Sequence, residues 1–526
     1  MTVIQPNSIS GINSITVQSG EGLSVHKSDG SLIREIVSAT GVGTFYAISV
    51  GTAGTVSNTG NAALAGIVTA NGGVKVGAAI SLHSNGNLGI TGIMTASSYV
   101  GDGSALTGIA GTEITDSDFA VGVSTFFVDY STSNVGINTV VPTAALDVTG
   151  DATVSGIVTA TTFVTTAGQL GHRNLIINGA MNVAQRGSSA TTDGFGTVDR
   201  FQCLYDGTDE APTQAHHTLT SGDTGPWEKG FRHSFQITNG NQTSGAGAAD
   251  SIAIFYEFEA QDIASSGWNY TSSSSYITLS FWIKASVAQN YYGYVRSIDG
   301  TQRAYDFETG SLTADAWTYI TKTIPGDSSL QFDYNTSLGF QVILYAFAGT
   351  NLTHSGRALN TWINNDDGTR TPDNTSTWYT TNDATFEFTG FQLEVGSVAT
   401  PFEHRSYAED LVKCQRYYYK LVCDSNEFFP VIGMADVDGN TIVLNTPFSV
   451  VMRDAPSAVE QTGTASDYKI RRSTTATCTS VPAFVHATVN QAVTNFVKSS
   501  HGFADGSCVR CMGGATGAFL AWSAEL

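Results

Sequence analysis

The chain has 526 residues, of which 24 are Lys or Arg and 45 are Asp or Glu, so its formal net charge at pH 7 is −21. This charge excludes a nucleic-acid-binding protein, because the phosphates of nucleic acid have to be matched by Lys and Arg. Only 13% of the residues are charged, and the Gly, Ser, Thr and Asn that replace them disfavour long helices. We therefore expect an all-β chain of about three domains.

The sequence also limits where the chain is made. No run of about 18 apolar residues that could span a bilayer is present, and the start, MTVIQPNSIS, lacks the basic and apolar regions of a signal peptide. We expect cytoplasmic synthesis without membrane insertion. The six cysteines are too sparse for a disulfide framework, and Cys508 and Cys511 of the CVRC motif would point to opposite faces of a strand. We expect buried free thiols, no metal and no cofactor.

Residues 1–170 consist of short Val, Ile and Thr clusters separated by Gly, without Trp or Cys. One phrase recurs at irregular spacing, as AGIVTANG (65–72), TGIMTASS (91–98) and SGIVTATT (155–162). Each copy predicts one short strand, which cannot bury its apolar side alone. Three chains wound together would give each Ile and Val a symmetric neighbour. We expect a trimeric β shaft, with a low-complexity linker as the alternative.

Two segments of this region resemble known repeats. GIMTASSYVGDGSALTGIA (92–110) and VGINTVVPTAALDVTGDATVSGIVTATTF (135–163) are similar to shaft repeats in the fibre proteins of tailed bacteriophages, especially phages of marine cyanobacteria. The resemblance implies a homotrimeric fibre that attaches to a phage tail, baseplate or adaptor protein through its N-terminal region. It also implies localisation in the virion, as a tail fibre, after synthesis in the host cytoplasm.

Residues 171–404 show the two-residue periodicity of strands. In YITLSFWIKAS (276–286), the alternate apolar residues from Ile277 to Ile283 share one face, which we expect to be buried, while the other face is wet. SIAIFYEFEA (251–260) repeats the pattern, with Glu257 and Glu259 on the solvated face. GFQVILYAFAG (339–349) is apolar on both faces and predicts a central strand. Eight or more such strands predict a two-sheet sandwich or jelly roll.

Two further features of this region predict local structure. In TFEFTGFQLEV (385–395) the apolar alternation changes phase at Gly390, which predicts a β-bulge. Residues 174–177 should form the first strand of the sandwich, with a turn at Asn178 and Gly179. His172 and Arg173, which have no carboxylate or nucleophile nearby in sequence, should make hinge contacts.

The same region resembles a module of phage tail fibres, which is itself similar to carbohydrate-binding jelly rolls. NLIINGAMNVAQRG (174–187), TVDRFQ (197–202) and TGFQLEVGSVATPFEHRSYAEDLVKCQRYYYKL (389–421) match its opening and closing motifs. The chain departs at Val183 and Ala184, where the family often has Ile and Trp, and at Phe201, where it has Trp. These changes lose no function if the positions lie in the core, and they weaken binding if the positions contact ligand.

Residues 405–423 predict a helix. Ser406 and Glu409 can form a capping box. A stripe at helical spacing follows, formed by Leu411, Cys414, Tyr418 and Leu421. In a trimer, three such stripes would meet in a short bundle, and docking of the stripe on the sandwich is the alternative.

Residues 424–526 are again strand-like. TPFSVVMRDAPSAVEQTG (446–463) and the final AFLAWSAEL (518–526) resemble the tip domains of phage fibres. The expected architecture is therefore all-β: a trimeric N-terminal shaft for virion attachment (1–170), a jelly-roll carbohydrate-binding-like module (171–404), a trimerising helix (405–423) and a β-rich C-terminal tip domain (424–526).

A fibre that recognises a host cell-surface glycan needs aromatic faces for stacking and polar groups for hydroxyls. The polar loop at 361–383, flanked by two Trp, is the richest segment. Our glycan-binding candidates are the aromatic residues on wet faces or in polar loops: Trp227, Trp268, Tyr270, Trp282, Tyr291, Tyr292, Trp362, Trp378 and Tyr379.

Other functions have to be weighed against a receptor-binding fibre. A purely structural virion fibre, collar or decoration protein could have almost the same sequence. A capsule depolymerase would need paired carboxylates, for which Glu257 and Glu259 are the candidates. SDYKIRRS (466–473) resembles the start of chaperones that excise themselves from some phage fibres. We expect no catalytic residue and no enzyme activity.

Overall fold

The computed structural model describes residues 23–27, 29–37, 74–76, 80–82, 88–90, 119–121, 125–129, 131–155 and 172–526. The chain divides into two compact units, Met1–Ser155 and Gly156–Leu526. Almost every regular element is a strand, which confirms the predicted all-β class. No helix in these residues is long and apolar enough to cross a membrane.

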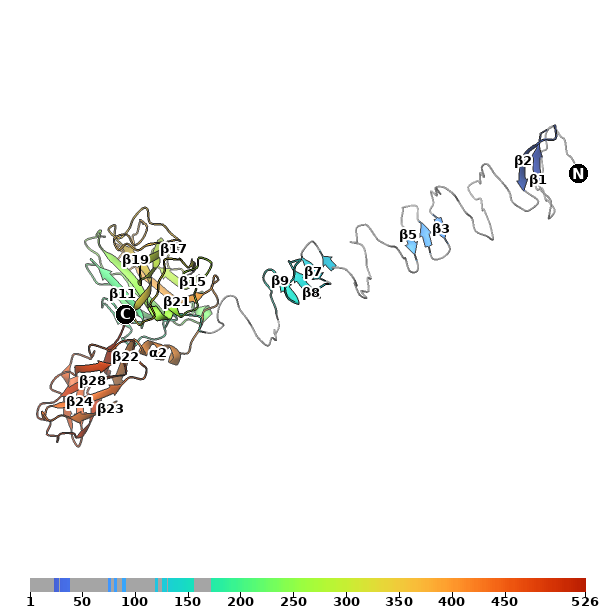
Figure 1. The fold of residues 1–526 in the computed structure, drawn as a ribbon. Helices are drawn as coiled ribbons and strands as arrows, with labels where there is room; N and C mark the ends of the chain where they lie inside the picture. Colours follow the sequence, from blue (N-terminus) through green and yellow to red (C-terminus); the bar gives the residue numbers. More distant parts are fainter. Residues whose placement is uncertain are drawn as a thin grey trace. The chain divides into compact units, whose positions relative to one another are not determined.

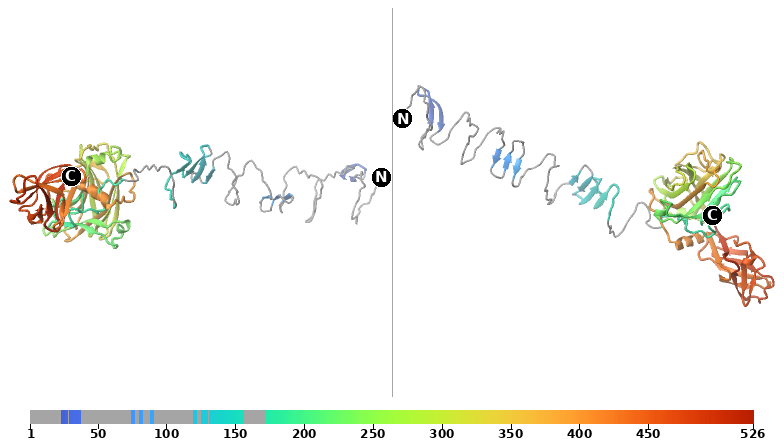
Figure 2. Two further views of the ribbon diagram at one scale, coloured as in Figure 1. Left: turned by 90° about the horizontal axis from the view of Figure 1, so that it is seen from below. Right: turned by 180° about the vertical axis from the view of Figure 1, so that it is seen from behind.

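The first unit contains small sheets (Figure 2). One sheet consists of β1 (Leu23–His26) and β2 (Leu32–Val37). Another consists of β3 (Val74–Val76), β4 (Ile80–Leu82) and β5 (Leu88–Ile90). A further sheet consists of β6 (Phe119–Val121), β7 (Phe126–Asp129), β8 (Asn134–Ile137) and β9 (Leu146–Val148). Several apolar side chains of this unit are exposed, among them Val141 at 73% and Leu146 at 62%. The segment 92–110 and the recurring phrases, apart from residue 155, lie outside the described residues.

The second unit begins with a sandwich of two six-stranded sheets (Figure 1). Sheet A has the order β10 (Ser189–Ala190), β12 (Thr213–Thr218), β13 (His233–Thr238), β21 (Thr385–Val395), β15 (Tyr276–Ala285) and β18 (Thr318–Pro325). Sheet B has the order β11 (Phe201–Asp206), β14 (Ser251–Glu259), β19 (Leu338–Ala348), β16 (Asn290–Ser297), β17 (Arg303–Ser311) and β20 (Trp362–Asn364). The two-sheet prediction is confirmed.

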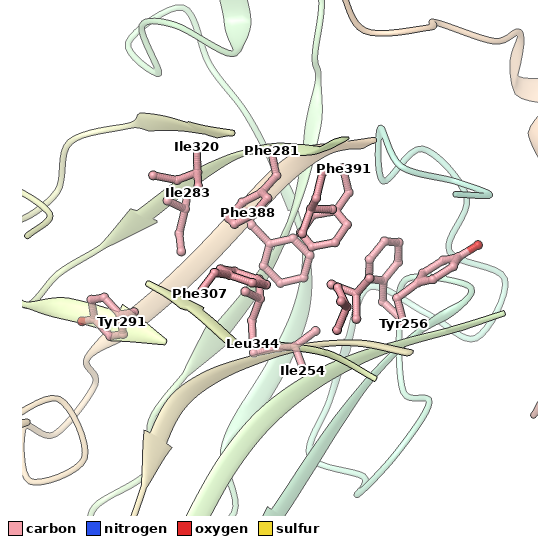
Figure 3. Packing of buried hydrophobic residues seen from close by; sticks show 14 of the residues in the cluster. Ile254, Tyr256, Phe281, Ile283, Tyr291, Phe307, Ile320, Leu344, Phe388 and Phe391 are labelled. Atoms are coloured by element: carbon pink, nitrogen blue, oxygen red, sulfur yellow. The ribbon is translucent and has the colours of Figure 1, made fainter. Parts of the chain in front are cut away.

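Apolar side chains from both sheets meet between them (Figure 3). Phe281, Ile283 and Phe388 come from sheet A, and Phe307 and Leu344 come from sheet B; all are fully or almost fully buried. Because successive side chains of a strand point to opposite faces, alternate positions supply this core. Burying one such side chain contributes about 1.5–3 kcal/mol.

The predicted strand patterns are confirmed in their core faces. The four apolar residues of β15 at 277, 279, 281 and 283 are at most 1% exposed. β19 is buried on both faces and lies in the interior of sheet B, as its continuous apolar sequence predicts. Phe201, where the related module has Trp, packs its ring against Tyr256 and Phe391 in the core. This departure therefore concerns core packing.

The predicted bulge lies in β21. Ser280 of β15 faces Gln392, and Trp282 faces Thr389. Gly390 and Phe391 of β21 therefore lie opposite the single residue Phe281 of β15. Residues three apart on a regular strand point to opposite faces, and the bulge lets Phe388 and Phe391 both enter the core. Gly390 has φ +67, a left-handed conformation that glycine adopts without strain.

Replacing Gly390 with Ala is expected to lower the free energy of unfolding by about 2 kcal/mol. The added Cβ would lie 2.7 Å from the ring of Phe231 at a positive φ. Gly310→Ala is the matched control, because Gly310 has φ +74 and no atom within 4 Å of an added Cβ; it should cost about 1 kcal/mol. Denaturant unfolding of both variants checks this, and equal losses would contradict the packing argument.

The stretch before the first sandwich strand differs from the prediction. Residues 174–177 form no strand, although Leu175 donates its backbone N–H to Leu393 O at 2.9 Å, beside β21. The side-chain amide of Asn174 instead donates a hydrogen bond to Phe391 O and accepts one from the backbone N–H of Leu393. These bonds take the place of regular backbone pairing between strands. The predicted turn is present, because Met181 N–H bonds Asn178 O at 2.9 Å.

The predicted helix is shorter than expected. α2 (Tyr407–Gln415) begins with the predicted capping box of Ser406 and Glu409, but the chain then enters β22 (Tyr418–Cys423). The four-residue stripe is therefore wrong as a helical face. Cys414 and Tyr418 are buried within the chain, while Leu411 and Leu421 are half-buried. Backbone pairing of β22 with β30 (Ala518–Ser523) outweighs the helical spacing.

Residues 418–526 form the C-terminal domain. Its larger sheet, the seven-stranded sheet, has the order β26 (Thr475–Thr477), β25 (Tyr468–Arg471), β29 (Cys508–Gly513), β23 (Phe428–Ala435), β24 (Thr441–Pro447), β28 (Gln491–Val497) and β27 (Ala483–Thr488). Cys508 is exposed and Cys511 is buried, so the two thiols point to opposite faces of β29 as predicted. The other four cysteines are buried and free, and the expectation fails only for Cys508.

A buried network of charges joins the sandwich to the C-terminal domain; we call it the domain junction. Arg416 binds both carboxylate oxygens of Glu259, at 2.6 and 2.7 Å, and Tyr417 donates its hydroxyl to the same carboxylate at 2.6 Å. Arg200 pairs with Glu525 near the C-terminus, and its guanidinium lies 3.5 Å from the centre of the Tyr417 ring.

The junction corrects the expectation of solvated carboxylates on β14. Glu259 is fully buried and Glu257 is 6% exposed, since residues of the junction cover this face of sheet B. Glu257 accepts a hydrogen bond from Gln341. Burial acts to raise the pKa of Glu259, but the hydrogen bonds from Arg416 and Tyr417 outweigh it and lower the pKa below its usual value.

Glu259→Gln is expected to destabilise the chain by about 3 kcal/mol at pH 7, because Arg416 loses its buried partner. Because the pKa of Glu259 is lower in the folded chain than the value of about 4.3 in the unfolded chain, its ionised carboxylate stabilises the fold at pH values above about 4.3. This stabilisation is lost as the pH falls through the pKa of the folded chain. The difference in Tm between wild type and Glu259→Gln should therefore shrink from pH 7 to pH 3. Exposed Glu228→Gln is the control, with little effect at either pH, and a pH-independent difference for Glu259→Gln would contradict the assignment.

Candidate functional site

Five of the nine aromatic glycan-binding candidates are buried, which corrects the expectation that they face solvent. Trp268, Tyr291, Trp362, Trp378 and Tyr379 are 0–8% exposed. Their polar atoms bind backbone carbonyls; for example, Trp378 Nε1 donates to Thr385 O at 2.9 Å and Trp362 Nε1 to Pro325 O at 2.7 Å. These side chains fill the sandwich and fix its loops.

The loop at 361–383 therefore does not present its two Trp to a ligand. Together with the segment after β19, it covers the outer face of sheet B, where Leu352 and Ile363 pack on a second apolar cluster around Phe255 and Tyr345. Arg357, which precedes the loop, forms a buried ion pair with Asp306 at 2.8 Å.

The outer face of sheet A carries a groove of about 590 Å³. Three neighbouring strands supply its floor, with Gly390 on β21, Trp282 on β15 and Tyr319 on β18. Trp282 and Tyr319 are cross-strand partners whose ring centres lie 5.1 Å apart, and Tyr319 is 43% exposed. Because Gly390 has no side chain, the floor has room at this position for the ring of Phe231.

The opposite wall of the groove is residues 399–404, with Lys229 at its end. Phe402 and Phe231 meet edge to face at 4.8 Å, and His404 Nε2 lies 2.8 Å from Lys229 O. Thr400 is held by Glu394, which accepts its backbone N–H at 2.8 Å and its hydroxyl at 2.6 Å. The groove is mainly apolar, with hydroxyl, amine and imidazole groups along one side.

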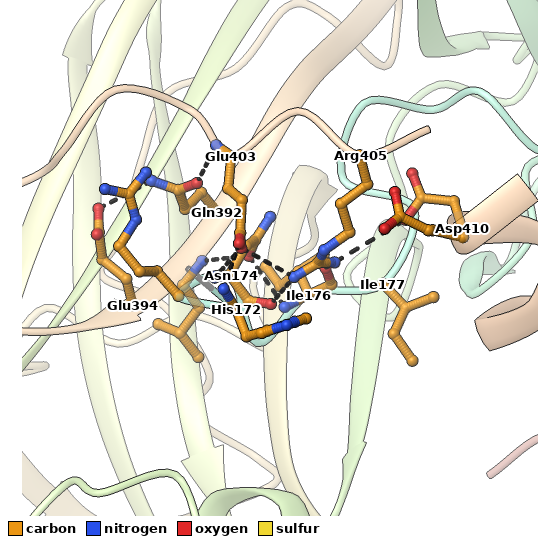
Figure 4. A network of polar contacts seen from close by, with 12 residues as sticks. His172, Asn174, Ile176, Ile177, Gln392, Glu394, Glu403, Arg405 and Asp410 are labelled. Carbon is orange, nitrogen blue, oxygen red and sulfur yellow. Dashed lines mark hydrogen bonds and ion pairs between the residues drawn. The ribbon is translucent and has the colours of Figure 1, made fainter. Parts of the chain in front are cut away.

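A polar network fixes this wall (Figure 4). The carboxylate of Glu403 accepts the backbone N–H groups of His172 and Asn174, and Gln392 accepts the N–H of Glu403 at 2.8 Å. Burial acts to raise the pKa of Glu403, but the Asn174 N–H and the charge of Arg405 outweigh it and lower the pKa. His172 and Arg173 thus contact the segment that follows β21, Arg173 through Pro401 O at 3.0 Å. The hinge role expected for these two residues stays a prediction.

A second network lies beside the groove on the same face of sheet A. Glu387 accepts from His217 Nδ1 at 2.9 Å and pairs with Lys284 at 3.0 Å, and Lys284 also pairs with Asp223 at 2.9 Å. Burial acts to raise the pKa of Glu387, but its bonds to His217 and Lys284 lower it, while the pKa of His217 is raised by the same bond. Because Glu387 is fully buried and its carboxylate is already bonded to His217 and Lys284, we assign this network a structural role beneath the sheet face next to Trp282.

Four candidates remain half-buried, and only some of them are near the groove. Trp282 lines it, and Trp227 packs on the cluster around Phe231, with the guanidinium of Arg232 3.8 Å from the centre of its ring. Tyr270 and Tyr292 lie elsewhere. Sequence reasoning missed Tyr319, Phe402 and His404.

No family model matches the chain, and no curated protein sequence matches it. Among solved structures, the enzymatically active domain of tailspike protein 4 from bacteriophage CBA120 is 8% identical with a TM-score of 0.23, over 42% of this chain and 21% of that chain. The N-terminal cellulose-binding domain of Cellulomonas fimi β-1,4-glucanase C is 12% identical with a TM-score of 0.20, over 41% of this chain and 99% of that chain. The tandem CBM22 domains of Paenibacillus barcinonensis Xyn10C are 8% identical with a TM-score of 0.21, over 68% of this chain and all of that chain. At these values the likenesses assign neither ligand nor activity to the chain.

Proposed function

We propose that the chain is a receptor-binding tail fibre of a bacteriophage and that the groove on sheet A binds a cell-surface glycan. One observation carries this proposal: Trp282 and Tyr319 form an accessible aromatic pair on the floor of the groove, opposite a wall with polar groups. The apolar faces of sugar rings stack on aromatic rings, and hydroxyls on their edges bind polar side chains and backbone groups.

The groove suits a short stretch of a neutral glycan. Its floor has no carboxylate, and Thr400 and His404 can exchange hydrogen bonds with hydroxyls. Glu394 and Glu403 hold the wall before a ligand enters, which lowers the entropy cost of binding. Single sites of this kind bind weakly, at roughly millimolar Kd, and several linked copies gain useful avidity.

The fibre assignment depends on the N-terminal unit. Its segment at 135–163 resembles phage shaft repeats, and Val141, Leu146 and Val154 are 58–73% exposed in the single chain. Three chains side by side would bury such residues, so a homotrimer is part of the proposal. In it, the N-terminal region attaches to a phage tail, baseplate or adaptor protein, and the chain functions in the virion as a binding protein without enzyme activity.

The aromatic floor gives a direct binding test. Trp282→Ala and Tyr319→Ala should each weaken binding to immobilised neutral oligosaccharides at least about tenfold, which corresponds to about 1.4 kcal/mol. Tyr334→Ala is the control, because Tyr334 is 78% exposed and outside the groove. An array of neutral and acidic oligosaccharides, read with the full chain, supplies the measurement. Unchanged binding in both groove variants would rule out the groove as the site.

The fibre assignment has its own test. The purified full chain should have three times the chain mass in solution, and it should compete with phage particles for adsorption to their host cells. The Trp282→Ala variant should have the same mass and compete poorly. If saturating wild-type protein leaves adsorption unchanged, the alternative of a purely structural fibre is favoured.

A further inference from the structure

The seven-stranded sheet has an unusual charge distribution. None of its strands contains Asp or Glu, although the whole chain has 45 acidic residues against 24 Lys and Arg. The same strands carry Lys469, Arg471 and Arg510. The strands themselves therefore carry only positive charges in a strongly anionic chain, and the acidic residues nearest to them in sequence, such as Glu427 and Asp467, lie in the flanking segments.

The three cations lie on one face of the sheet. Arg471 and Arg510 are direct cross-strand partners, and Lys469 is two residues from Arg471 on the same strand. Both arginines are exposed, and within residues 172–526 neither forms a salt bridge. Like charges in direct cross-strand positions repel each other, so an anion between them would be stabilised.

Apolar side chains extend this face beside the cations. Ile432 is the cross-strand partner of Arg510, and it is 61% exposed. Met434, on the same face, is 57% exposed. The guanidinium of Arg510 lies 4.9 Å from the centre of the Phe428 ring, which restrains its position. The opposite face of the sheet packs into the domain core through Phe429, Ile470 and Cys511, so the cationic face is the open one.

We propose that this open face is a second glycan-binding site, which takes a polysaccharide bearing carboxylate or sulfate groups. Arg471 and Arg510 bind the anionic group through paired N–H donors, and Lys469 adds a third positive charge. Ile432 and Phe428 contact the apolar faces of the adjoining sugar rings. The site does not depend on the groove of sheet A.

Charge favours a polysaccharide over other polyanions. The chain has a net charge of −21, which repels a nucleic acid or an anionic membrane as a whole. Three local cations and an apolar strip suit a polymer in which single anionic groups are separated by uncharged sugar surface. Pairing between the three cations and a single anionic group of the polysaccharide is then favourable. A nucleic acid or an anionic membrane would instead bring many phosphates close to the acidic remainder of the chain.

The test uses the full-length chain and three immobilised probes: dextran sulfate, carboxymethyl-dextran and unmodified dextran. At low salt we expect binding to the sulfated or the carboxylated probe, or to both, and the pair of probes identifies the anionic group. The double variant Arg471→Gln/Arg510→Gln should lose at least about tenfold in affinity. Lys498→Gln, in a loop of the same domain, and Trp282→Ala, in the groove, should bind these two probes as wild type does.

Other outcomes would overturn the proposal. These are absence of binding to both charged probes, an equal loss for Lys498→Gln, and equal or tighter binding to single-stranded DNA or to phosphatidylserine vesicles. A change in oligomeric mass in the double variant would show that a second copy of the chain covers this face. Because the double variant relieves repulsion, its Tm should not fall below that of wild type, and a lower Tm would mean that the arginines stabilise the fold. If Trp282→Ala loses binding to neutral glycans but still binds the charged probes, only the groove is affected. The proposal for the groove and the proposal for the open face can therefore be contradicted independently.

Discussion

The domain junction is the interaction on which the second unit depends. Glu259 and Glu525 are carboxylates with little or no access to water, and removing a carboxylate from water costs several kcal/mol unless it is matched. Arg416 and Arg200 match them, with Tyr417 between. Arg416 lies 157 residues from Glu259 in sequence, and Arg200 lies 325 residues from Glu525. Only the folded chain brings these four charged residues together.

Much of the fold could be predicted because strand faces are a local property. The core face of β15 and the change of phase at Gly390 each depend on a few neighbouring residues, and both predictions are confirmed. The prediction that the other face of β15 is wet is wrong for Thr278 and Ser280, which are buried. The end of α2 could not be predicted in this way. Tyr418 and Leu421 have helical spacing from Cys414, but their backbone groups pair with β30, about a hundred residues further on. Tertiary pairing decides the conformation there, as it often does for short amphipathic segments.

The site was only partly predictable for a similar reason. Trp282 was identified because it lies on the face of its strand that was predicted to be wet. Tyr319 is its neighbour only because of the register in which β15 pairs with β18, and this register could not be predicted from the local sequence pattern. Trp378 and Tyr379 lie in a polar segment and are nevertheless buried, since their rings pack in the main core and their polar atoms bond backbone carbonyls. A polar neighbourhood in sequence is thus a poor guide to exposure for aromatic residues in long loops.

The contacts of Glu403 have a mechanical consequence. Its carboxylate accepts the N–H groups of His172 and Asn174, where the chain enters the sandwich, and its own N–H is bound by Gln392 on β21. Tension applied to the chain at residue 172 is therefore shared among several hydrogen bonds that are loaded together. The segment that carries this load is also the wall of the groove, so a pull along the chain and the shape of the groove are coupled.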